Sequence, residues 1–223
     1  GGAALTVRGA DGRELMVEAD LVLVAVGRRP RTEGLGLEEL GVRLERGAIV
    51  VDERQQTSIP GIYAAGDVTG GWQLAHVAFH EGAAAAEHAL GCPGAPVRRE
   101  AVPRCVYTHP ELGAVGLTEK EARERYGAVQ VGRFPFAANG KALALGEGEG
   151  LVKVIAEPRY GQVVGVGVAG PGATELVSEA ALAVAEECTL DELAEVIHAH
   201  PTLAEAIREA ALAAAGRPLH FGR

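Results

Sequence analysis

The sequence lacks the features that would assign it to a membrane, secreted or zinc-binding class. No apolar run is long enough to span a bilayer, and no charged-then-apolar signal segment stands at its start. Its three cysteines, Cys92, Cys105 and Cys188, are far apart, which rules out a local redox disulfide and a zinc knuckle. Because their number is odd, a secreted disulfide framework is also disfavoured. We therefore expect a soluble, cytoplasmic protein.

Basic residues are fewer than acidic ones. The chain carries 21 Lys and Arg against 30 Asp and Glu, a formal net charge of −9. Since phosphate binding needs clustered Lys and Arg, this balance argues against nucleic-acid and anionic-membrane partners. With 223 residues, 48% of them hydrophobic, the chain is long enough for one large domain or two small ones.

The first segment predicts a strand pair. GGAALTVRGADGRELMVEADLVLVAVG reads as two strands joined by a turn at Asp11-Gly12, the second ending in the apolar run LVLVAVG. There is no initiator methionine, and nothing precedes the strand pair for it to pair against. We expect that the true beginning of the protein is missing.

The remaining segments predict two regions separated by a linker. LAHVAFHEGAAAAEHAL, residues 74–90, has helical composition, and GCPGAPVRRE has the Gly and Pro of an interdomain linker. After the linker, GLVKVIAE and QVVGVGVAG predict strands around the turn PRYG, and the Asn-Gly of FAANGKA predicts a turn. TEKEARERYG and three later segments that each open with threonine predict helices. The capping-box spacing of Thr followed by Glu three residues later occurs at 118/121, 189/192 and 202/205.

The stretch HAHPTLAEA, residues 198–206, has three readings. Two histidines two residues apart in an extended segment point the same way and could hold a metal, as could His76 and His80 on a helix. Neither pair has a third ligand nearby, so a metal site is disfavoured. Glu205 would close a capping box worth about 1 kcal/mol, which favours a helix start. The third reading, an acid–base pair within this stretch, stays open.

Five segments occur in the order in which flavin-dependent pyridine nucleotide–disulfide oxidoreductases carry them. They are VLVAVGRRPRTEGLGLEELGV, TSIPGIYAAGDVTGG, LAHVAFHEG, VYTHPELGAVGLTEKEA and HAHPTLAEA. The whole chain resembles the carboxyl-terminal half of that family. Within the family, HAHPTLAEA and YTHPELGAVG are most similar to the dihydrolipoamide dehydrogenases. Glutathione reductases lack the HAH form, and mercuric reductases lack the histidine pair.

The resemblance implies an α/β fold with an α+β carboxyl-terminal domain. Residues 1–27 would end the NAD-binding domain, residues 28–98 would form the central domain that contacts FAD, and residues 99–223 would form the dimer-interface domain. The family's FAD-binding domain, its CxxxxC disulfide and the glycine loop of its NAD domain have no counterpart in the chain. It would therefore be a half-enzyme, or one piece of a longer chain, and we expect it to be inactive alone.

The resemblance also assigns the flavin contacts. Asp67 would accept a hydrogen bond from a ribityl hydroxyl of FAD, and Gly66 would let the backbone approach the cofactor. Leu74, Ala75 and His76 would lie along the isoalloxazine edge. At this helix start the backbone N–H of Ala75 would face the pyrimidine oxygen, where negative charge is favoured.

For NAD, the resemblance implies contacts from two places in the chain. Gly27 would pass close to the dinucleotide. The backbone near Cys105 and Val106 would approach the nicotinamide carboxamide.

For catalysis, the resemblance makes His200 the base that takes a proton from a thiol of reduced lipoamide, so that the thiolate attacks the enzyme disulfide. Glu205 would fix the tautomer of His200 and stabilise its imidazolium. The capping box and this pair would compete for one carboxylate. His198 would support the base, and the family suggests a cis His200–Pro201 bond.

The expected activity is oxidation of dihydrolipoamide with FAD and NAD⁺, in a 2-oxo-acid dehydrogenase complex. The enzyme would be a homodimer whose active sites are shared across the twofold axis, and it would dock a dihydrolipoyl acyltransferase subunit. The alternatives are a glutathione reductase-like or other disulfide reductase of the family, and an inactive isolated dimerisation module.

Overall fold

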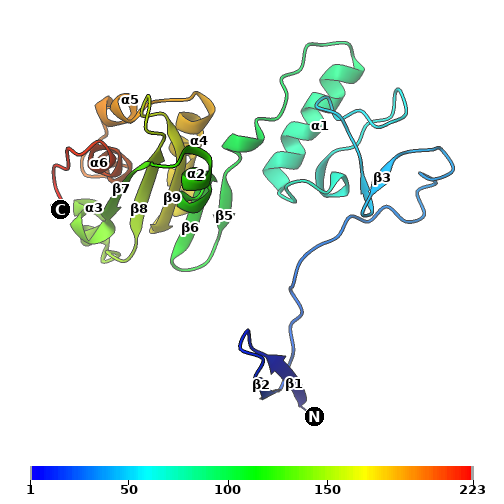
Figure 1. Cartoon of the computed structure of the whole chain (residues 1–223), viewed down its shortest axis with the longest axis horizontal. Coiled ribbons are helices and arrows are strands. Elements are labelled where there is room, and N and C mark those ends of the chain that lie inside the picture. Colours follow the sequence, from blue (N-terminus) through cyan, green and yellow to red (C-terminus); the bar gives the residue numbers. More distant parts are fainter. Residues whose placement is uncertain (1, 222–223) are drawn as a thin grey trace. The chain divides into compact units, whose positions relative to one another are not determined.

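A computed structural model gives the fold of the chain and describes residues 2–221 (Figure 1). The chain forms two compact units that divide between Val97 and Arg98. The division falls within GCPGAPVRRE, the segment whose glycines and prolines predict a linker. Each unit has its own core.

The first unit begins with the predicted hairpin. Strands β1 (Ala3–Arg8) and β2 (Glu14–Ala19) pair antiparallel. The turn between them has Gly12 at φ +79°, a conformation that glycine adopts without strain, and Asp11 accepts a hydrogen bond from the Arg13 N–H. The Asp11-Gly12 turn is confirmed.

The apolar run after β2 is not a strand, and this corrects the prediction for LVLVAVG. A strand needs a neighbour to pair its backbone N–H and C=O groups, and none of the described strands pairs with residues 21–27. Leu21, Leu23 and Val26 are 85, 86 and 94% exposed. Hydrophobicity and β propensity therefore identified an apolar segment but did not show whether it forms a strand.

The rest of this unit is built from short elements and one long helix. Strands β3 (Leu44–Glu45) and β4 (Ala48–Ile49) form a small hairpin, and the 3-10 turn η1 (Gly66–Thr69) follows. Helix α1 (Ala75–Ala89) confirms the predicted helix. It packs against η1.

The second unit is an antiparallel five-stranded sheet with helices on both faces, which confirms the α+β expectation. The order β5-β6-β9-β8-β7 is made by β5 (Arg104–Val106), β6 (Glu111–Gly116), β7 (Gln130–Pro135), β8 (Leu151–Ala156) and β9 (Val163–Gly170). The helical elements are η2 (Arg99–Ala101), α2 (Glu119–Tyr126), η3 (Phe136–Ala138), α3 (Gly140–Leu145), α4 (Ala173–Ala185), α5 (Leu190–Glu195) and α6 (Glu205–Ala214).

Alternation along the strands decides which helices cover which face. Val152 and Val154 of β8 are fully buried in the cluster that α4 and α6 complete. On the opposite face, Ile155 packs with Val164 of β9 and Ala122 of α2. The face under α4 and α6 carries the main core of this unit.

Two of the predicted capping boxes are present. Thr118 and Glu121 form the box at α2, and Thr189 and Glu192 form the box at α5.

Other helix starts differ from the prediction. The residue before α4 is Gly172, in the left-handed conformation, and not a threonine. Asn139 accepts the Ala142 N–H at 2.9 Å, so the Asn-Gly pair starts helix α3 and is not the predicted turn.

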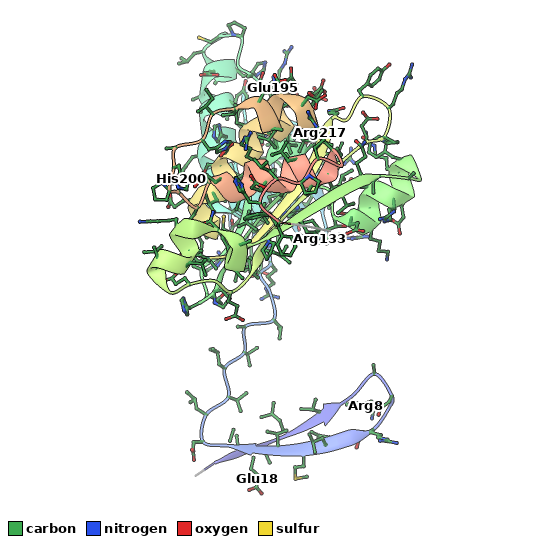
Figure 2. The ribbon with its side chains drawn as sticks, turned by 90° about the vertical axis from the view of Figure 1, so that its left-hand side faces the viewer. Arg8, Glu18, Arg133, Glu195, His200 and Arg217 are labelled. Carbon is green, nitrogen blue, oxygen red and sulfur yellow. The ribbon has the colours of Figure 1, made fainter. Side chains whose placement is uncertain are left out.

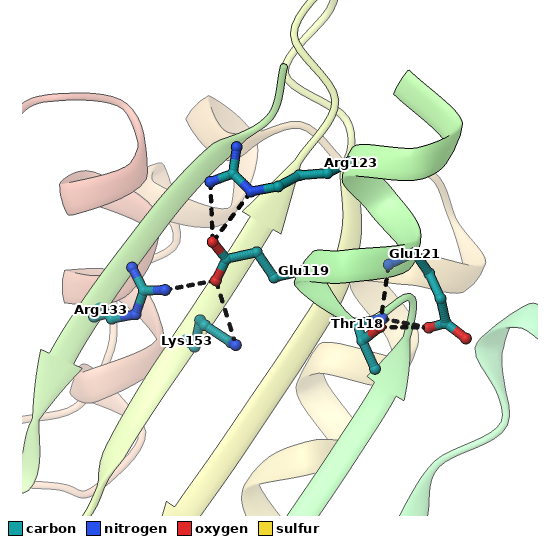
Figure 3. A network of polar contacts seen from close by, with 6 residues as sticks. All are labelled: Thr118, Glu119, Glu121, Arg123, Arg133 and Lys153. Carbon is teal, nitrogen blue, oxygen red and sulfur yellow. Dashed lines mark hydrogen bonds and ion pairs between the residues drawn. The ribbon is translucent and has the colours of Figure 1, made fainter. Parts of the chain in front are cut away.

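Helix α2 is tied to the sheet by one carboxylate. Figure 3 shows Glu119 between Arg123 of its own helix, Arg133 of β7 and Lys153 of β8, at 2.9, 2.5 and 3.6 Å. Hydrogen bonding to Arg123 and the surrounding cations lower the pKa of Glu119, although burial opposes the shift. The network joins one helix to two strands.

Helix α6 approaches β7 so closely that only glycine fits at residue 132. A Cβ there would lie 2.0 Å from the Ala210 carbonyl oxygen and 2.2 Å from the Ala214 nitrogen. Both are backbone atoms, which cannot move without displacing the helix. Gly132 therefore sets the distance between the sheet and the helix that begins at Glu205.

Gly132→Ala is expected to destabilise the chain by about 3 kcal/mol, because overpacking must move α6 off the sheet. Gly167→Ala is the matched control, since a Cβ at Gly167 of β9 meets nothing within 4 Å. Urea denaturation of the two variants measures the difference. Equal stabilities would contradict the close approach.

The turn from β8 to β9 is organised by Glu157. Its carboxylate accepts backbone N–H groups of Arg159, Tyr160 and Gln162 at 2.8, 2.5 and 3.2 Å. Burial raises the pKa of Glu157, but these hydrogen bonds outweigh it and hold the pKa below its ordinary value.

A lowered folded-state pKa contributes stability above the unfolded-state pKa, and this contribution is lost as the pH falls through the folded-state pKa. Glu157→Gln should therefore lower the free energy of unfolding at pH 7. The difference from the parent should shrink below the ordinary glutamate range. Denaturation at a series of pH values measures it, and a difference independent of pH would contradict the assignment.

Candidate active site

The segment between α5 and α6 holds HAHPTL in an irregular loop. The His200–Pro201 peptide bond is cis, as the resemblance suggests. The hydroxyl of Thr202 donates to the Ala199 carbonyl at 2.7 Å, and Asn139 donates its side-chain N–H to the Thr202 carbonyl at 3.0 Å. The loop is thus held from within and from the start of α3.

Glu205 is the first residue of α6 and uses its two carboxylate oxygens separately. Oε1 lies 2.9 Å from Nδ1 of His200, and Oε2 accepts the Thr202 N–H at 2.9 Å. The expected competition for this carboxylate is therefore absent. The full capping box is absent too, because the Thr202 hydroxyl bonds to Ala199 and the residue before the helix is Ala204.

The charge state of Glu205 follows from these contacts. Burial raises its pKa, but the hydrogen bonds from Thr202 and His200 and the charges of His200 and His198 lower it below the ordinary value. The carboxylate is thus ionised at neutral pH. An anion at the first turn is also favoured by the helix dipole.

His200 has one ring nitrogen occupied and one available. A carboxylate oxygen can only accept, so Nδ1 carries a proton and the neutral imidazole has its lone pair on Nε2. The His200 side chain is 76% exposed beside the start of α6 (Figure 2). The pair can therefore take up a proton at Nε2 and stabilise the resulting cation.

His198 faces a partner that sequence reasoning missed. Its Nε2 lies 2.8 Å from Oε1 of Glu179 on α4, and its side chain is 5% exposed. Because Glu179 precedes His198 by 19 residues and belongs to another helix, no local spacing links the two. Only the packing of α4 against the sheet brings them together.

In the first unit, Gly66 and Asp67 start the η1 turn. Gly66 is buried at φ +80°, and its N–H donates to Oε2 of the buried Glu81 at 2.7 Å. The Asp67 carboxylate is half-buried and accepts from Arg28 through Oδ2, with Nη2 at 2.7 Å and Nε at 2.9 Å. Arg28 and Glu81 are further residues that sequence reasoning missed.

Leu74, Ala75 and His76 form the start of α1. Leu74 is extended, with φ −129° and ψ 134°, and no side chain caps the helix. The first N–H groups of an α-helix have no intrahelical acceptor and carry partial positive charge. Backbone donors are therefore presented next in sequence to the η1 turn that holds Asp67.

The two proposed NAD contacts lie in different units. Gly27 is exposed at φ +140°, a conformation reserved for glycine, and Val106 is a 47% exposed residue of β5. Beside Val106, burial raises the pKa of the Cys105 thiol, which packs against the main core.

No group of three or more His, Cys, Asp and Glu side chains that could hold a metal ion occurs within residues 2–221. The two histidines of HAH bond to separate carboxylates instead. Across the same residues, no helix combines the length and apolar character needed to cross a membrane.

Relatives of the chain are dihydrolipoyl dehydrogenases. One from Bacillus subtilis is 49% identical over 93% of this chain and 45% of its own length. One from Thermus scotoductus is 50% identical over 94% and 45%, and the mitochondrial one of Pisum sativum is 45% identical over 99% and 44%. The chain thus spans about half the length of the curated relatives it matches.

Solved structures of other proteins and two family models also match this chain. LpdA of Mycobacterium tuberculosis superposes with a TM-score of 0.83 at 36% identity, covering 94% of this chain and 48% of that one. The flavoprotein disulfide reductase RclA of Escherichia coli, as its Cu(II) complex, gives 0.83 at 28%, covering 93% and 47%. The model described as "Pyridine nucleotide-disulphide oxidoreductase" matches residues 1–82, and that of its "dimerisation domain" matches residues 102–211. The chain therefore belongs to the pyridine nucleotide-disulphide oxidoreductase family.

Proposed function

We propose that this chain is the part of a dihydrolipoyl dehydrogenase that carries the catalytic base and the dimer interface. The observation that carries the proposal is the 2.9 Å contact between His200 Nδ1 and the Glu205 carboxylate, which leaves Nε2 exposed. The chain's similarity to dihydrolipoyl dehydrogenases supports the choice of substrate.

In the proposed reaction, a thiol of dihydrolipoamide donates its proton to Nε2 of His200. The thiolate then attacks one sulfur of the enzyme disulfide, and the other sulfur leaves as a thiolate. Glu205 holds the imidazole in the accepting tautomer and pairs with the imidazolium that forms. In the reverse direction the same nitrogen returns the proton. General-base catalysis of this kind contributes about 10²–10⁴ in rate.

FAD and NAD⁺ are the proposed cofactors, and the first unit fits the flavin. Asp67 has a second carboxylate oxygen for a hydroxyl, and Ala75 lies at a helix start that presents N–H donors. Gly66 places Asp67 through a turn at φ +80°, and a Cβ on it would lie 3.2 Å from the Ala78 Cβ of α1. Leu74 and His76 would flank the ring, and Gly27 and Val106 would contact NAD. When bound, the flavin carries electrons between the disulfide and the nicotinamide.

The protein is proposed to act as a homodimer, in agreement with the match of residues 102–211 to a dimerisation domain. His200 and Glu205 would then serve the disulfide and flavin of the other subunit, and a dihydrolipoyl acyltransferase subunit would deliver the substrate. A glutathione reductase-like or other disulfide reductase activity is the alternative, which a comparison of substrates on the full-length protein separates. The chain alone is expected to be inactive.

His200→Ala in the full-length protein should lower dihydrolipoamide oxidation by about 10²–10⁴-fold, because the thiol proton loses its acceptor. Bound flavin should be unchanged. Steady-state turnover and the visible absorption spectrum measure the two effects.

The matched control is His220→Ala. His220 also bonds through Nδ1 to a glutamate of α6, Glu209, at 2.8 Å, but it lies outside the HAHPTL loop. Near-normal turnover in His200→Ala, or an equal loss in His220→Ala, would contradict the assignment of His200 as the base.

Asp67→Ala should weaken flavin binding about tenfold or more, because a hydrogen bond to a charged group contributes about 1.5–3 kcal/mol. Titration of the full-length apoprotein with FAD measures the dissociation constant. Glu87→Ala, which removes an exposed carboxylate of α1, is the control and should leave it unchanged. An unchanged constant in Asp67→Ala would remove Asp67 from the flavin site.

A further inference from the structure

Helix α1 buries an acidic side chain against the turn that carries Asp67. Glu81 is 1% exposed, and its Oε2 accepts the Gly66 N–H at 2.7 Å. Acidic residues are seldom fully buried, because a carboxyl group removed from water costs stability unless it is hydrogen-bonded. An apolar side chain would fill this position at lower cost if packing were its only role. The acidic group at residue 81 therefore has a role other than packing.

The same face of α1 lies close to the backbone of the η1 turn. A Cβ on Gly66 would lie 3.2 Å from the Cβ of Ala78, closer than ordinary van der Waals contact. Ala78 and Glu81 are three residues apart in the helix, so their side chains lie on one face. Gly66 is thus held to α1 by close packing and by a hydrogen bond.

The peptide that joins Gly66 to Asp67 is held from its other side as well. The hydroxyl of Thr69 donates to the Gly66 carbonyl at 2.9 Å. The Asp67 carboxylate is in turn held by Arg28, with Nη2 at 2.7 Å and Nε at 2.9 Å from Oδ2. Because bonds engage both the N–H and the C=O of Gly66, the backbone that carries Asp67 has a fixed direction relative to α1.

We propose that Glu81 is a positioning residue for the flavin site, which fixes Asp67 relative to the start of α1 through its bond to Gly66. The inference rests on the proposed function. Ala75, the other proposed flavin contact, lies six residues before Glu81 on the same helix. Glu81 therefore joins the two elements that would contact FAD. A site fixed before binding loses less freedom when the ligand binds, so this bond raises the affinity for FAD without touching it.

The test compares two variants of the full-length apoprotein by titration with FAD. Glu81→Leu removes the acceptor but keeps a side chain of similar size, and it should raise the dissociation constant about tenfold. Glu81→Gln keeps an oxygen that can accept the Gly66 N–H, and it should stay near the parent value. Glu87→Leu, at an exposed position of the same helix, is the control and should change nothing.

A double-mutant cycle separates positioning of Asp67 from general damage to the fold. Added to Asp67→Ala, the Glu81→Leu change should raise the dissociation constant little further, because the contact that it positions is already absent. Equal rises in the parent and in Asp67→Ala would make the role purely structural and overturn the proposal. A constant unchanged in Glu81→Leu, or raised as much in Glu81→Gln, would overturn it as well.

Glu81→Asp replaces Glu81→Leu in the same cycle if the leucine variant does not fold. It keeps the acidic group but withdraws it from Gly66 by one methylene, so it should also weaken FAD binding, and only where Asp67 is present. An unchanged dissociation constant would overturn the proposal. Failure of the proposed function is distinct, since near-normal turnover in His200→Ala defeats it, whereas FAD binding that is indifferent to Glu81 defeats the present inference alone.

Discussion

The contact between Glu205 and His200 depends on a carboxylate that bonds in two directions. One oxygen accepts the Thr202 N–H and fixes the carboxylate in the loop, and the other holds Nδ1 of His200. Because the bond from Thr202 fixes the carboxylate, the backbone that precedes α6 sets the orientation of the His200 imidazole. The close approach of α6 to β7 at Gly132 in turn sets the distance between the sheet and the helix that Glu205 begins. The base is therefore positioned by the sheet through one helix.

Three histidines of the second unit, His198, His200 and His220, pair one ring nitrogen with a glutamate and differ in the surroundings of the other ring nitrogen. In His200 it is exposed, which permits proton transfer with a substrate. In His198 it lies 3.0 Å from the Val196 carbonyl oxygen inside the loop, and the side chain is buried. His220 bonds through Nδ1 to Glu209, whose second oxygen accepts the backbone N–H of His220, so this pair binds residue 220 to α6. His200 and His220 are exposed to a similar extent, 76 and 65%, so solvent access separates His198 from the other two, and the place of His200 in the HAHPTL loop separates it from His220.

Local signals in the sequence predicted what local contacts decide. The boxes at Thr118 and Thr189 formed, because each hydroxyl and carboxylate bond within one turn of helix. The box at Thr202 did not, because its hydroxyl bonds to the preceding Ala199 carbonyl and the residue before α6 is Ala204. The spacing in HAHPTLAEA allowed a contact between His200 and Glu205. It could not show that the second oxygen of the carboxylate accepts the Thr202 N–H. Contacts across the fold, such as those between Glu179 and His198 or Arg28 and Asp67, leave no pattern in a single sequence.

The tautomer of His200 is the claim on which the account depends, and neutron diffraction of the deuterated protein above neutral pH tests it directly. We predict a deuteron on Nδ1, shared with Glu205, and none on Nε2. A deuteron on Nε2 with a bare Nδ1 would contradict the account. His200 could then accept no proton from a thiol, and Glu205 would have to be protonated to hold the ring.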